Sequence, residues 1–178
     1  MTEARLPLTY YVAASLDGFI ATPDGGVAWL DPFQASGDDH GFTDFFATVG
    51  ALIMGSHTYE FALAHPPWMG AGRPTVVYTS RDLPLADDTV SLTTDPPAAV
   101  MARLAAAGVQ HAWLLGGGEL ASTFLQAGLL TRLTLAVVPV VLGDGIPLFA
   151  RGPSESTVAL ETTRTFDSGL VLLDYRIG

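Results

Sequence analysis

Three amino acids are missing from this 178-residue sequence: cysteine, lysine and asparagine. Without cysteine there can be no thiol nucleophile, disulfide framework, iron–sulfur cluster or cysteine-based zinc site. The absence of lysine excludes a Schiff-base lysine and the lysine of a Walker-A phosphate loop. Because asparagine is absent, the chain has no N-glycosylation acceptor. Several catalytic and processing chemistries are thus excluded before any motif is considered.

Basic residues are scarce: eight arginines stand against 18 acidic residues, which gives a net charge of −10. Nucleic-acid binders need a basic surface that displaces counterions from phosphates, so we expect no nucleic-acid partner. The charge is still compatible with a phosphorylated small molecule. Its phosphates would have to be bound locally, by backbone N–H groups, hydroxyls and individual arginines.

Long hydrophobic runs are also absent, since no uninterrupted apolar stretch approaches the roughly 18 residues that a membrane helix needs. The first eight residues lack the pattern of a signal peptide. We therefore expect a cytoplasmic protein with no membrane partner. Hydrophobic residues make up 49% of the chain, enough for a substantial core, and the length suits a single domain over residues 1–178.

Apolar and β-branched runs alternate with helical patterns along most of the chain. The patterns predict strands at residues 10–14, 19–21, 51–54, 75–79, 89–93, 112–115 and 132–142, the last with Pro139 at an edge or bulge. They predict helices at 42–49, 56–64, 96–107 and 119–127. A terminal hairpin is expected at 157–165 and 170–177. This order predicts an α/β fold with a mixed, mainly parallel sheet and a C-terminal antiparallel hairpin.

Three strand ends carry glycines or hydroxyls that favour a bound anion: residues 55–58, 79–81 and 116–119. Parallel sheets bind ligands beyond the carboxyl ends of their strands, so the three segments are more informative together than singly. Each also has a simpler interpretation: an N-cap at Ser56, a solvated turn at Arg81 and a tight-packing turn at the glycines. Gly116, Gly118 and Ala121 match the spacing of a Rossmann fingerprint, but their late position and the lack of an acidic residue at 136–140 disfavour a Rossmann dehydrogenase.

These segments, together with 11–21 and 138–149, occur in an order that resembles the dihydrofolate-reductase-like superfamily. The closer resemblance is to the branch containing the C-terminal reductase domain of riboflavin biosynthesis, over residues 8–177. It implies a three-layer α/β/α fold with a central mixed eight-stranded sheet, NADPH as hydride donor and a homodimer. The implied activity is similar to that of 5-amino-6-(5-phosphoribosylamino)uracil reductase and dihydrofolate reductase.

The resemblance also implies which residues contact the cofactor. Ala13 and Ile20 would face the nicotinamide, and Arg81 would select the 2′-phosphate. The phosphates would be bordered by Gly55, Ser56, His57 and Thr58, and the adenosine end by Thr79, Ser80 and Arg81. The pyrophosphate would be bracketed by Gly116, Gly117, Gly118, Glu119 and Leu120, with a Gly116–Gly117 peptide that is cis in relatives.

The substrate side departs from the folate-reducing members of the superfamily. Ser56 stands where they usually have arginine, and Ala136 stands where a threonine supports their substrate-binding acid. By spacing from Gly55, Asp39 falls nearest to that acid. These departures weaken folate as the substrate.

A dry pocket under Trp29 and Phe42 would suit a flat heterocycle, although core packing is the alternative for both rings. Asp39 or Asp17 could anchor the polar edge of the substrate or relay a proton, although an Asp–Gly pair at residue 17 also suits an ordinary turn. The four histidines show no metal-ligand spacing, so we expect no metal. The leading hypothesis is therefore an NADPH-dependent reductase of a small heterocycle. The alternative is a non-catalytic, dimeric NADP-binding protein that has lost the substrate-binding acid.

Overall fold

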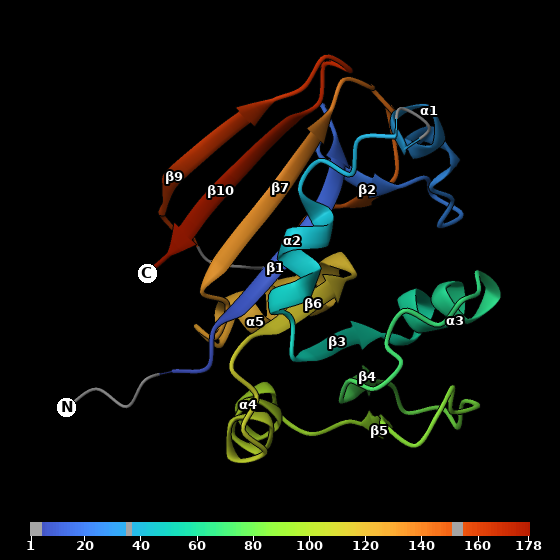
Figure 1. Ribbon diagram of the computed structural model, residues 1–178, viewed down its shortest axis with the longest axis vertical. Helices are drawn as coiled ribbons and strands as arrows, with labels where there is room; N and C mark the ends of the chain where they lie inside the picture. Colours follow the sequence, from blue (N-terminus) through green and yellow to red (C-terminus); the bar gives the residue numbers. More distant parts are fainter. Residues whose placement is uncertain (1–4, 35–36, 151–154) are drawn as a thin grey trace.

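The computed structural model describes residues 5–34, 37–150 and 155–178, and its centre is an eight-stranded sheet of order β5-β4-β3-β6-β1-β7-β10-β9 (Figure 1). The strands are β1 (Leu8–Ser15), β3 (Ala51–Gly55), β4 (Thr75–Tyr78), β5 (Val90–Thr93), β6 (Ala112–Gly116), β7 (Arg132–Val138), β9 (Val158–Thr165) and β10 (Val171–Ile177). Every pairing from β5 to β7 is parallel, whereas β10 runs antiparallel to both β7 and β9. The mainly parallel sheet with an antiparallel C-terminal hairpin confirms the predicted fold class.

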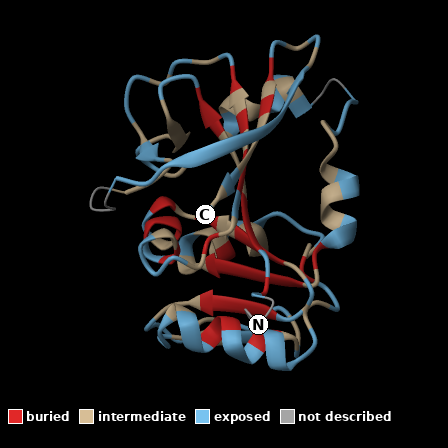
Figure 2. Ribbon diagram, turned by 90° about the vertical axis from the view of Figure 1, so that its left-hand side faces the viewer, coloured by how far each residue is buried: buried red, intermediate tan, exposed pale blue. Residues whose placement is uncertain are grey.

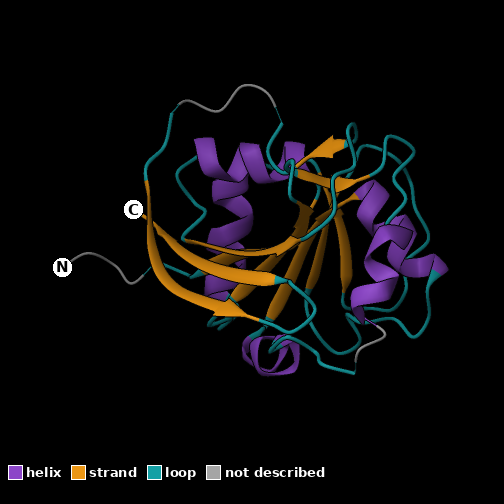
Figure 3. Cartoon of the chain, turned by 90° about the horizontal axis from the view of Figure 1, so that it is seen from above, coloured by secondary structure: helices purple, strands orange, loops and turns teal. Residues whose placement is uncertain are grey.

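Helices cover both faces of this sheet (Figure 3). Successive strand residues point to opposite faces, so in β3 Ala51 and Ile53 belong to one apolar cluster and Leu52 and Met54 to another. The first cluster packs against α4 (Pro97–Ala106) and α5 (Gly118–Gln126). The second packs against α2 (Phe42–Thr48) and α3 (Ser56–Ala64). This arrangement is the three-layer architecture that the resemblance implied.

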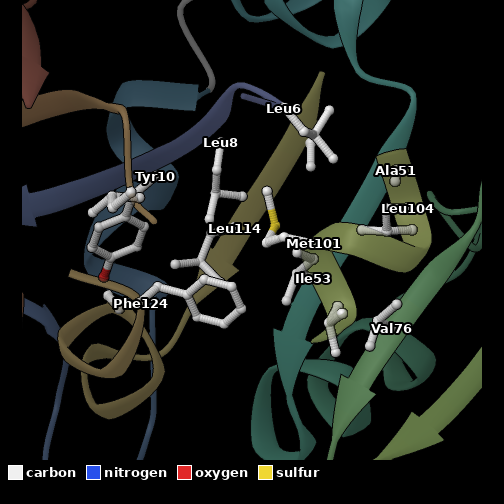
Figure 4. Packing of buried hydrophobic residues seen from close by; sticks show 14 of the residues in the cluster. Leu6, Leu8, Tyr10, Ala51, Ile53, Val76, Met101, Leu104, Leu114 and Phe124 are labelled. Carbon is white, nitrogen blue, oxygen red and sulfur yellow. The ribbon is translucent and has the colours of Figure 1, made fainter. Parts of the chain in front are cut away.

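The first cluster forms the centre of the molecule, where large side chains from the middle strands meet those of α5. Tyr10, Leu114 and Phe124 lie together there (Figure 4) and are fully buried. Burial of this kind stabilises the fold by roughly 25 cal/mol for each Å² of apolar surface removed from water. Because the middle strands are fixed in this way, the ends of β1, β3 and β6 are held in defined positions relative to one another.

Burial falls away toward the C-terminal edge. All eight residues of β9 are exposed, and the strand is pale blue in Figure 2. Val158 and Leu160 are among the exposed large hydrophobic residues of the described chain, Leu160 with 54% of its surface accessible. Among the described residues no strand pairs with the outer side of β9, and this edge strand carries apolar side chains.

One local prediction was wrong, and one short helix was not predicted. The strand expected to reach residue 142 ends at Val138, because Pro139 has no N–H for the ladder and the N–H of Val140 turns back onto the carbonyl of Val138 at 2.7 Å. The polar segment that begins at Asp31 forms a short helix, α1 (Asp31–Gln34), which follows the 3-10 turn η1 (Ala28–Leu30). Pro32 is tolerated there because the first turn of a helix needs no N–H donor at that position.

A small second sheet lies beside the main one. It pairs β2 (Phe19–Ala21) with β8 (Ile146–Pro147), which the sequence did not predict as a strand. Asp17 joins the same region: its carboxylate accepts hydrogen bonds from Ser15 Oγ at 2.7 Å, from Leu142 N at 3.0 Å and from Gly143 N at 2.7 Å. The loop after β7 is thereby attached to the turn that follows β1. Within the described residues, no helix is long and apolar enough to cross a membrane.

Candidate active site

Two helices begin at glycines on neighbouring parallel strands. Gly55 ends β3 and is the N-cap of α3, and Gly117 follows β6 and is the N-cap of α5. Within the described chain no side chain caps either helix, so Ser56 is not the N-cap that one interpretation of the sequence suggested. The first N–H groups of both helices are left for another acceptor, and helix N-termini favour anions.

The backbones of these two junctions approach each other closely. A Cβ added to Gly55 would lie 3.9 Å from the carbonyl oxygen of Gly116 and 4.0 Å from the nitrogen of Gly117. Gly116 has a φ of 123°, a region that favours glycine, and the Gly116–Gly117 peptide is cis, as the resemblance implied. A Cβ on Gly117 would meet no atom within 4 Å. The two strand ends therefore present a bare, open backbone surface, which we call the glycine cradle: residues 55 and 116–117.

The residues that follow the glycine cradle differ in their packing and exposure. Gly118 is required by packing, because a Cβ there would lie 2.2 Å from the carbonyl oxygen of Pro147. Glu119 is exposed in the first turn of α5, and Leu120 packs against the first apolar cluster. On α3, His57 is exposed and Thr58 is half-buried, both in the first turn after Gly55.

The next strand end, after β4, carries an ion pair. The N–H of Arg81 donates to Thr79 Oγ1 at 2.9 Å, and Ser80 between them is exposed. The guanidinium of Arg81 donates two hydrogen bonds to Glu60 on α3, Nη1 to Oε1 at 3.0 Å and Nη2 to Oε2 at 2.6 Å. These bonds lower the pKa of Glu60 and raise that of Arg81. Sequence reasoning missed Glu60, because it lies 21 positions before Arg81 and no motif connects the two residues.

A cavity of about 410 Å³ lies against β1 and β7 on the α2 face of the sheet. Its walls come from these strands, from α1 and the segment before α2, and from single residues of β6 and of the loop before β10: Tyr11, Val12, Ala13, Leu30, Phe33, Gln34, Asp38, Asp39, His40, Phe42, Trp113, Ala136, Val138 and Leu170. Ala13 and Ala136 are paired in register across β1 and β7 and contribute only methyl groups. The ring centroids of Phe42 and Trp113 are 5.5 Å apart. A mostly apolar cavity with a few polar groups is typical of small-molecule sites.

Three of the four phenylalanine, tyrosine and tryptophan residues around this cavity were not chosen from the sequence. Phe42 was chosen and lines it, together with Tyr11, Phe33 and Trp113. Burial raises the pKa of Tyr11, so its hydroxyl stays protonated at neutral pH. Trp29 is not among the lining residues and instead packs against the apolar cluster around Ala136.

Asp39 lies at the cavity, but its carboxylate already binds the backbone. Oδ1 accepts from Gly41 N and Oδ2 from Thr43 N, both at 2.9 Å. Hydrogen bonds from Thr43 and then Gly41 hold the pKa of Asp39 below its usual value. Asp39 is therefore ionised at neutral pH and can accept hydrogen bonds from a ligand, whereas it is poorly suited to give up a proton.

His40 is a second residue that sequence reasoning missed. Its φ of 54° is the one positive value among the non-glycine residues of the described chain. Its ring lies edge-on to Phe166, with centroids 4.7 Å apart, and its Nε2 atom is buried without a hydrogen-bond partner among the described residues. A buried polar atom without a partner is costly, so Nε2 retains the capacity for one hydrogen bond, and His40 lines the cavity. The sequence pointed to Asp39 beside it, by its spacing from Gly55, but no local signal distinguished His40.

Two predicted residues lie away from the cavity. Asp17 is exposed and is not a lining residue, and its three hydrogen bonds, first that from Ser15, lower its pKa to about 2. Ile20 is half-buried on β2 and is also absent from the lining. Among residues 5–34, 37–150 and 155–178, no group of three or more histidine, aspartate and glutamate side chains could hold a metal ion.

A mainly parallel α/β sheet with a bare backbone cradle at its carboxyl edge and an apolar cavity beside it defines a class of ligand-binding α/β proteins. Within that class, the chain belongs to the family described as the RibD C-terminal domain, whose model matches residues 7–172. The family is reductase-like, and the match agrees with the expected branch of the dihydrofolate-reductase-like superfamily.

Individual proteins are similar to the chain over most of its length. An uncharacterized protein of Bacillus subtilis, YwjB, is 35% identical over 163 residues, which are 91% of this chain and 93% of that protein. A Shewanella sp. PV-4 protein described as a candidate riboflavin biosynthesis protein has the same fold, with a TM-score of 0.85 at 24% identity over 97% of this chain and 99% of its own.

A bifunctional enzyme of Thermotoga maritima also shares the fold. It is a diaminohydroxyphosphoribosylaminopyrimidine deaminase and 5-amino-6-(5-phosphoribosylamino)uracil reductase, with a TM-score of 0.72 at 14% identity. The likeness covers 99% of this chain but 58% of that enzyme, so this chain matches one part of a longer protein.

Proposed function

We propose that this protein is an NADPH-dependent reductase that transfers a hydride to a small, flat heterocycle. One observation carries the proposal: two helix N-termini without side-chain caps meet at the glycine cradle. The cradle lies at the carboxyl edge of the sheet, and β1, whose residues line the cavity, runs toward that same edge. The N–H groups suit a pyrophosphate, and a side chain at Gly55 would cover them. An acidic protein can bind a polyanion in this way without a basic surface.

The residues of the site fit the parts of a nicotinamide dinucleotide. Gly55, Ser56 and Thr58 would hold the phosphates together with Gly117, whose surroundings are open. The other members of the predicted cofactor site are assigned as the resemblance implies: Ala13 and Ile20 to the nicotinamide, His57 and Gly116, Gly118, Glu119 and Leu120 to the phosphates, and Thr79, Ser80 and Arg81 to the adenosine end. When bound, NADPH supplies the hydride.

The chain itself has to orient the substrate and supply a proton. Phe42 and Trp113 provide apolar walls for a flat ring, and the Asp39 carboxylate accepts hydrogen bonds from its polar edge. Reduction of a C=N or C=O bond leaves nitrogen or oxygen in need of a proton. His40 has the free Nε2 atom for that transfer, which makes it a better candidate than Asp39 or Asp17, whose carboxylates are occupied by hydrogen bonds.

The function is tested by measuring NADPH oxidation in the presence of 5-amino-6-(5-phosphoribosylamino)uracil and, separately, of dihydrofolate. We expect turnover of the ribosylamino-pyrimidine and little of dihydrofolate, because Ser56 and Ala136 depart from the folate pattern. Tight binding of NADPH without turnover of either compound would favour the non-catalytic NADP-binding protein instead.

We also propose that the protein acts in the cytoplasm as a homodimer, with no nucleic-acid or membrane partner. The support for the dimer is the β9 edge, whose eight residues are exposed and include Val158 and Leu160. Exposed apolar edge strands are liable to pair with another chain, and a second copy would cover this one.

A further inference from the structure

We propose that Glu60 sets how strongly this site prefers a dinucleotide with a 2′-phosphate over one with a free 2′-hydroxyl. The inference rests on the proposed binding of a nicotinamide dinucleotide, but Glu60 belongs neither to the sequence motifs nor to the residues that the resemblance supplies. Its basis is the geometry at the end of β4, where the cation expected to bind the phosphate already has an anionic partner.

The pair between Glu60 and Arg81 occupies both terminal nitrogens of the guanidinium. Nη1 and Nη2 each donate to a different carboxylate oxygen, at 3.0 and 2.6 Å, which is the two-pronged arrangement that arginine also uses for phosphate. A 2′-phosphate at Arg81 would thus compete with Glu60 for the same donors. Both side chains are accessible, 49% for Arg81 and 41% for Glu60, so the exchange of partners needs no opening of the core.

The charges at this point favour the free hydroxyl. Arg81 and Glu60 together carry no net charge, and the lowered pKa of Glu60 keeps its carboxylate ionised at neutral pH. A 2′-phosphate is therefore repelled by the Glu60 carboxylate while it is attracted by the Arg81 guanidinium. A ribose 2′-hydroxyl could donate to the Glu60 carboxylate and leave the ion pair intact. Glu60 consequently lowers the affinity for NADPH and not that for NADH, so it reduces the difference between the two affinities.

The test measures nucleotide binding without turnover. Adenosine 2′,5′-bisphosphate and AMP differ by the phosphate at issue, and isothermal titration of each gives their affinity ratio. We expect Glu60→Gln to raise the affinity for the bisphosphate about two- to fivefold, the range for loss of a competing surface charge. The affinity for AMP should stay the same or fall slightly, because its 2′-hydroxyl loses a charged acceptor. NADP⁺ and NAD⁺ should show the same shift. Glu60→Ala should act in the same direction and guards against an effect peculiar to glutamine.

Glu161→Gln is the matched control. Glu161 is also paired with arginines, Arg132 at 2.9 Å and Arg176 at 3.3 Å, but it lies on β9 at the opposite edge of the sheet from β4. The same chemical change there should leave the affinity ratio as in the wild type. Failure of the wild type to bind either dinucleotide would overturn the proposed function and this inference with it. Binding of both with an unchanged ratio in Glu60→Gln and Glu60→Ala would overturn the role of Glu60 alone.

Discussion

Arg81 carries the proposed preference for NADPH at the scale of single residues. Its replacement should remove the donors for a 2′-phosphate, so we expect Arg81→Ala to weaken NADP⁺ binding about tenfold more than NAD⁺ binding, as measured by titration. Arg103→Ala provides the control, because Arg103 is equally exposed and is likewise paired with a carboxylate, that of Asp95. An equal loss for the two cofactors in Arg81→Ala would contradict the assignment.

The residues of the candidate site show which roles could be predicted from the sequence. Phe42 and Asp39 could be placed near a substrate because a helical spacing and a distance from Gly55 pointed to them. His40 and Glu60 could not, since their roles depend on contacts made in space: an unsatisfied imidazole atom at the cavity and an arginine 21 residues away. Trp29 belonged to a plausible aromatic set, but the fold directs Leu30 and Phe33 to the cavity instead.

At the scale of elements, the glycines at the helix starts have two different purposes. Gly55 has an extended backbone with a φ of −81°, and an added Cβ would make only ordinary contacts at 3.9 and 4.0 Å. Gly55→Ala should therefore fold with wild-type stability yet bind NADP⁺ at least about tenfold more weakly, because the methyl group would cover the cradle N–H groups.

For Gly118→Ala we expect a loss of stability, in contrast to Gly55→Ala. Its Cβ would meet the carbonyl oxygen of Pro147 at 2.2 Å, so the segment of β8 would have to move away from α5. Thermal unfolding and NADP⁺ titration of both variants separate the two effects: Gly118→Ala should melt several degrees lower. Wild-type affinity in a folded Gly55→Ala protein would contradict the cradle.

Asp17 links the turn after β1 to the loop after β7, and we expect its contribution to stability to depend on pH. The folded state lowers its pKa from 3.8 to about 2. A lowered carboxyl pKa adds stability that is complete above the unfolded value and is lost as the pH falls toward the folded one. Asp17→Asn should therefore be less stable than the wild type at neutral pH, and the difference should shrink between about pH 4 and about pH 2 in urea unfolding. A difference that stays constant over that range would contradict this role.

Most of the elements could be predicted because their apolar spacing and glycine stops are local. The exceptions have tertiary causes. β8 consists of two residues and exists because Phe19 and Ala21 pair with it, and the end of β7 depends on a turn at Pro139 that a continuous apolar run conceals. The strand order was not contained in local spacing either, since it places β7 between β1 and β10.

At the scale of the whole molecule, the exposed β9 edge predicts self-association. Leu160→Arg would put a charge into the proposed contact between two copies, so sedimentation should show a dimer for the wild type and a monomer for the variant. Leu85→Arg is the matched control, because Leu85 is equally exposed, 55% against 54%, but lies in the loop between β4 and β5. A wild-type monomer would contradict the proposal.

The acidic composition first suggested a molecule with little affinity for polyanions, and the fold explains how one could still bind. The cradle offers backbone N–H groups, and Arg81 after β4 offers one guanidinium, instead of a basic surface. The central claim is that a nicotinamide dinucleotide lies along this edge with its reactive ring at the cavity.

A crystal structure of the protein with NADP⁺ tests that claim most directly. We predict the pyrophosphate at Gly55 and Gly117 and the nicotinamide beside Ala13, at the wall of the cavity that holds His40. A dinucleotide bound elsewhere, or a cradle that stays empty at saturating NADP⁺, would contradict the account.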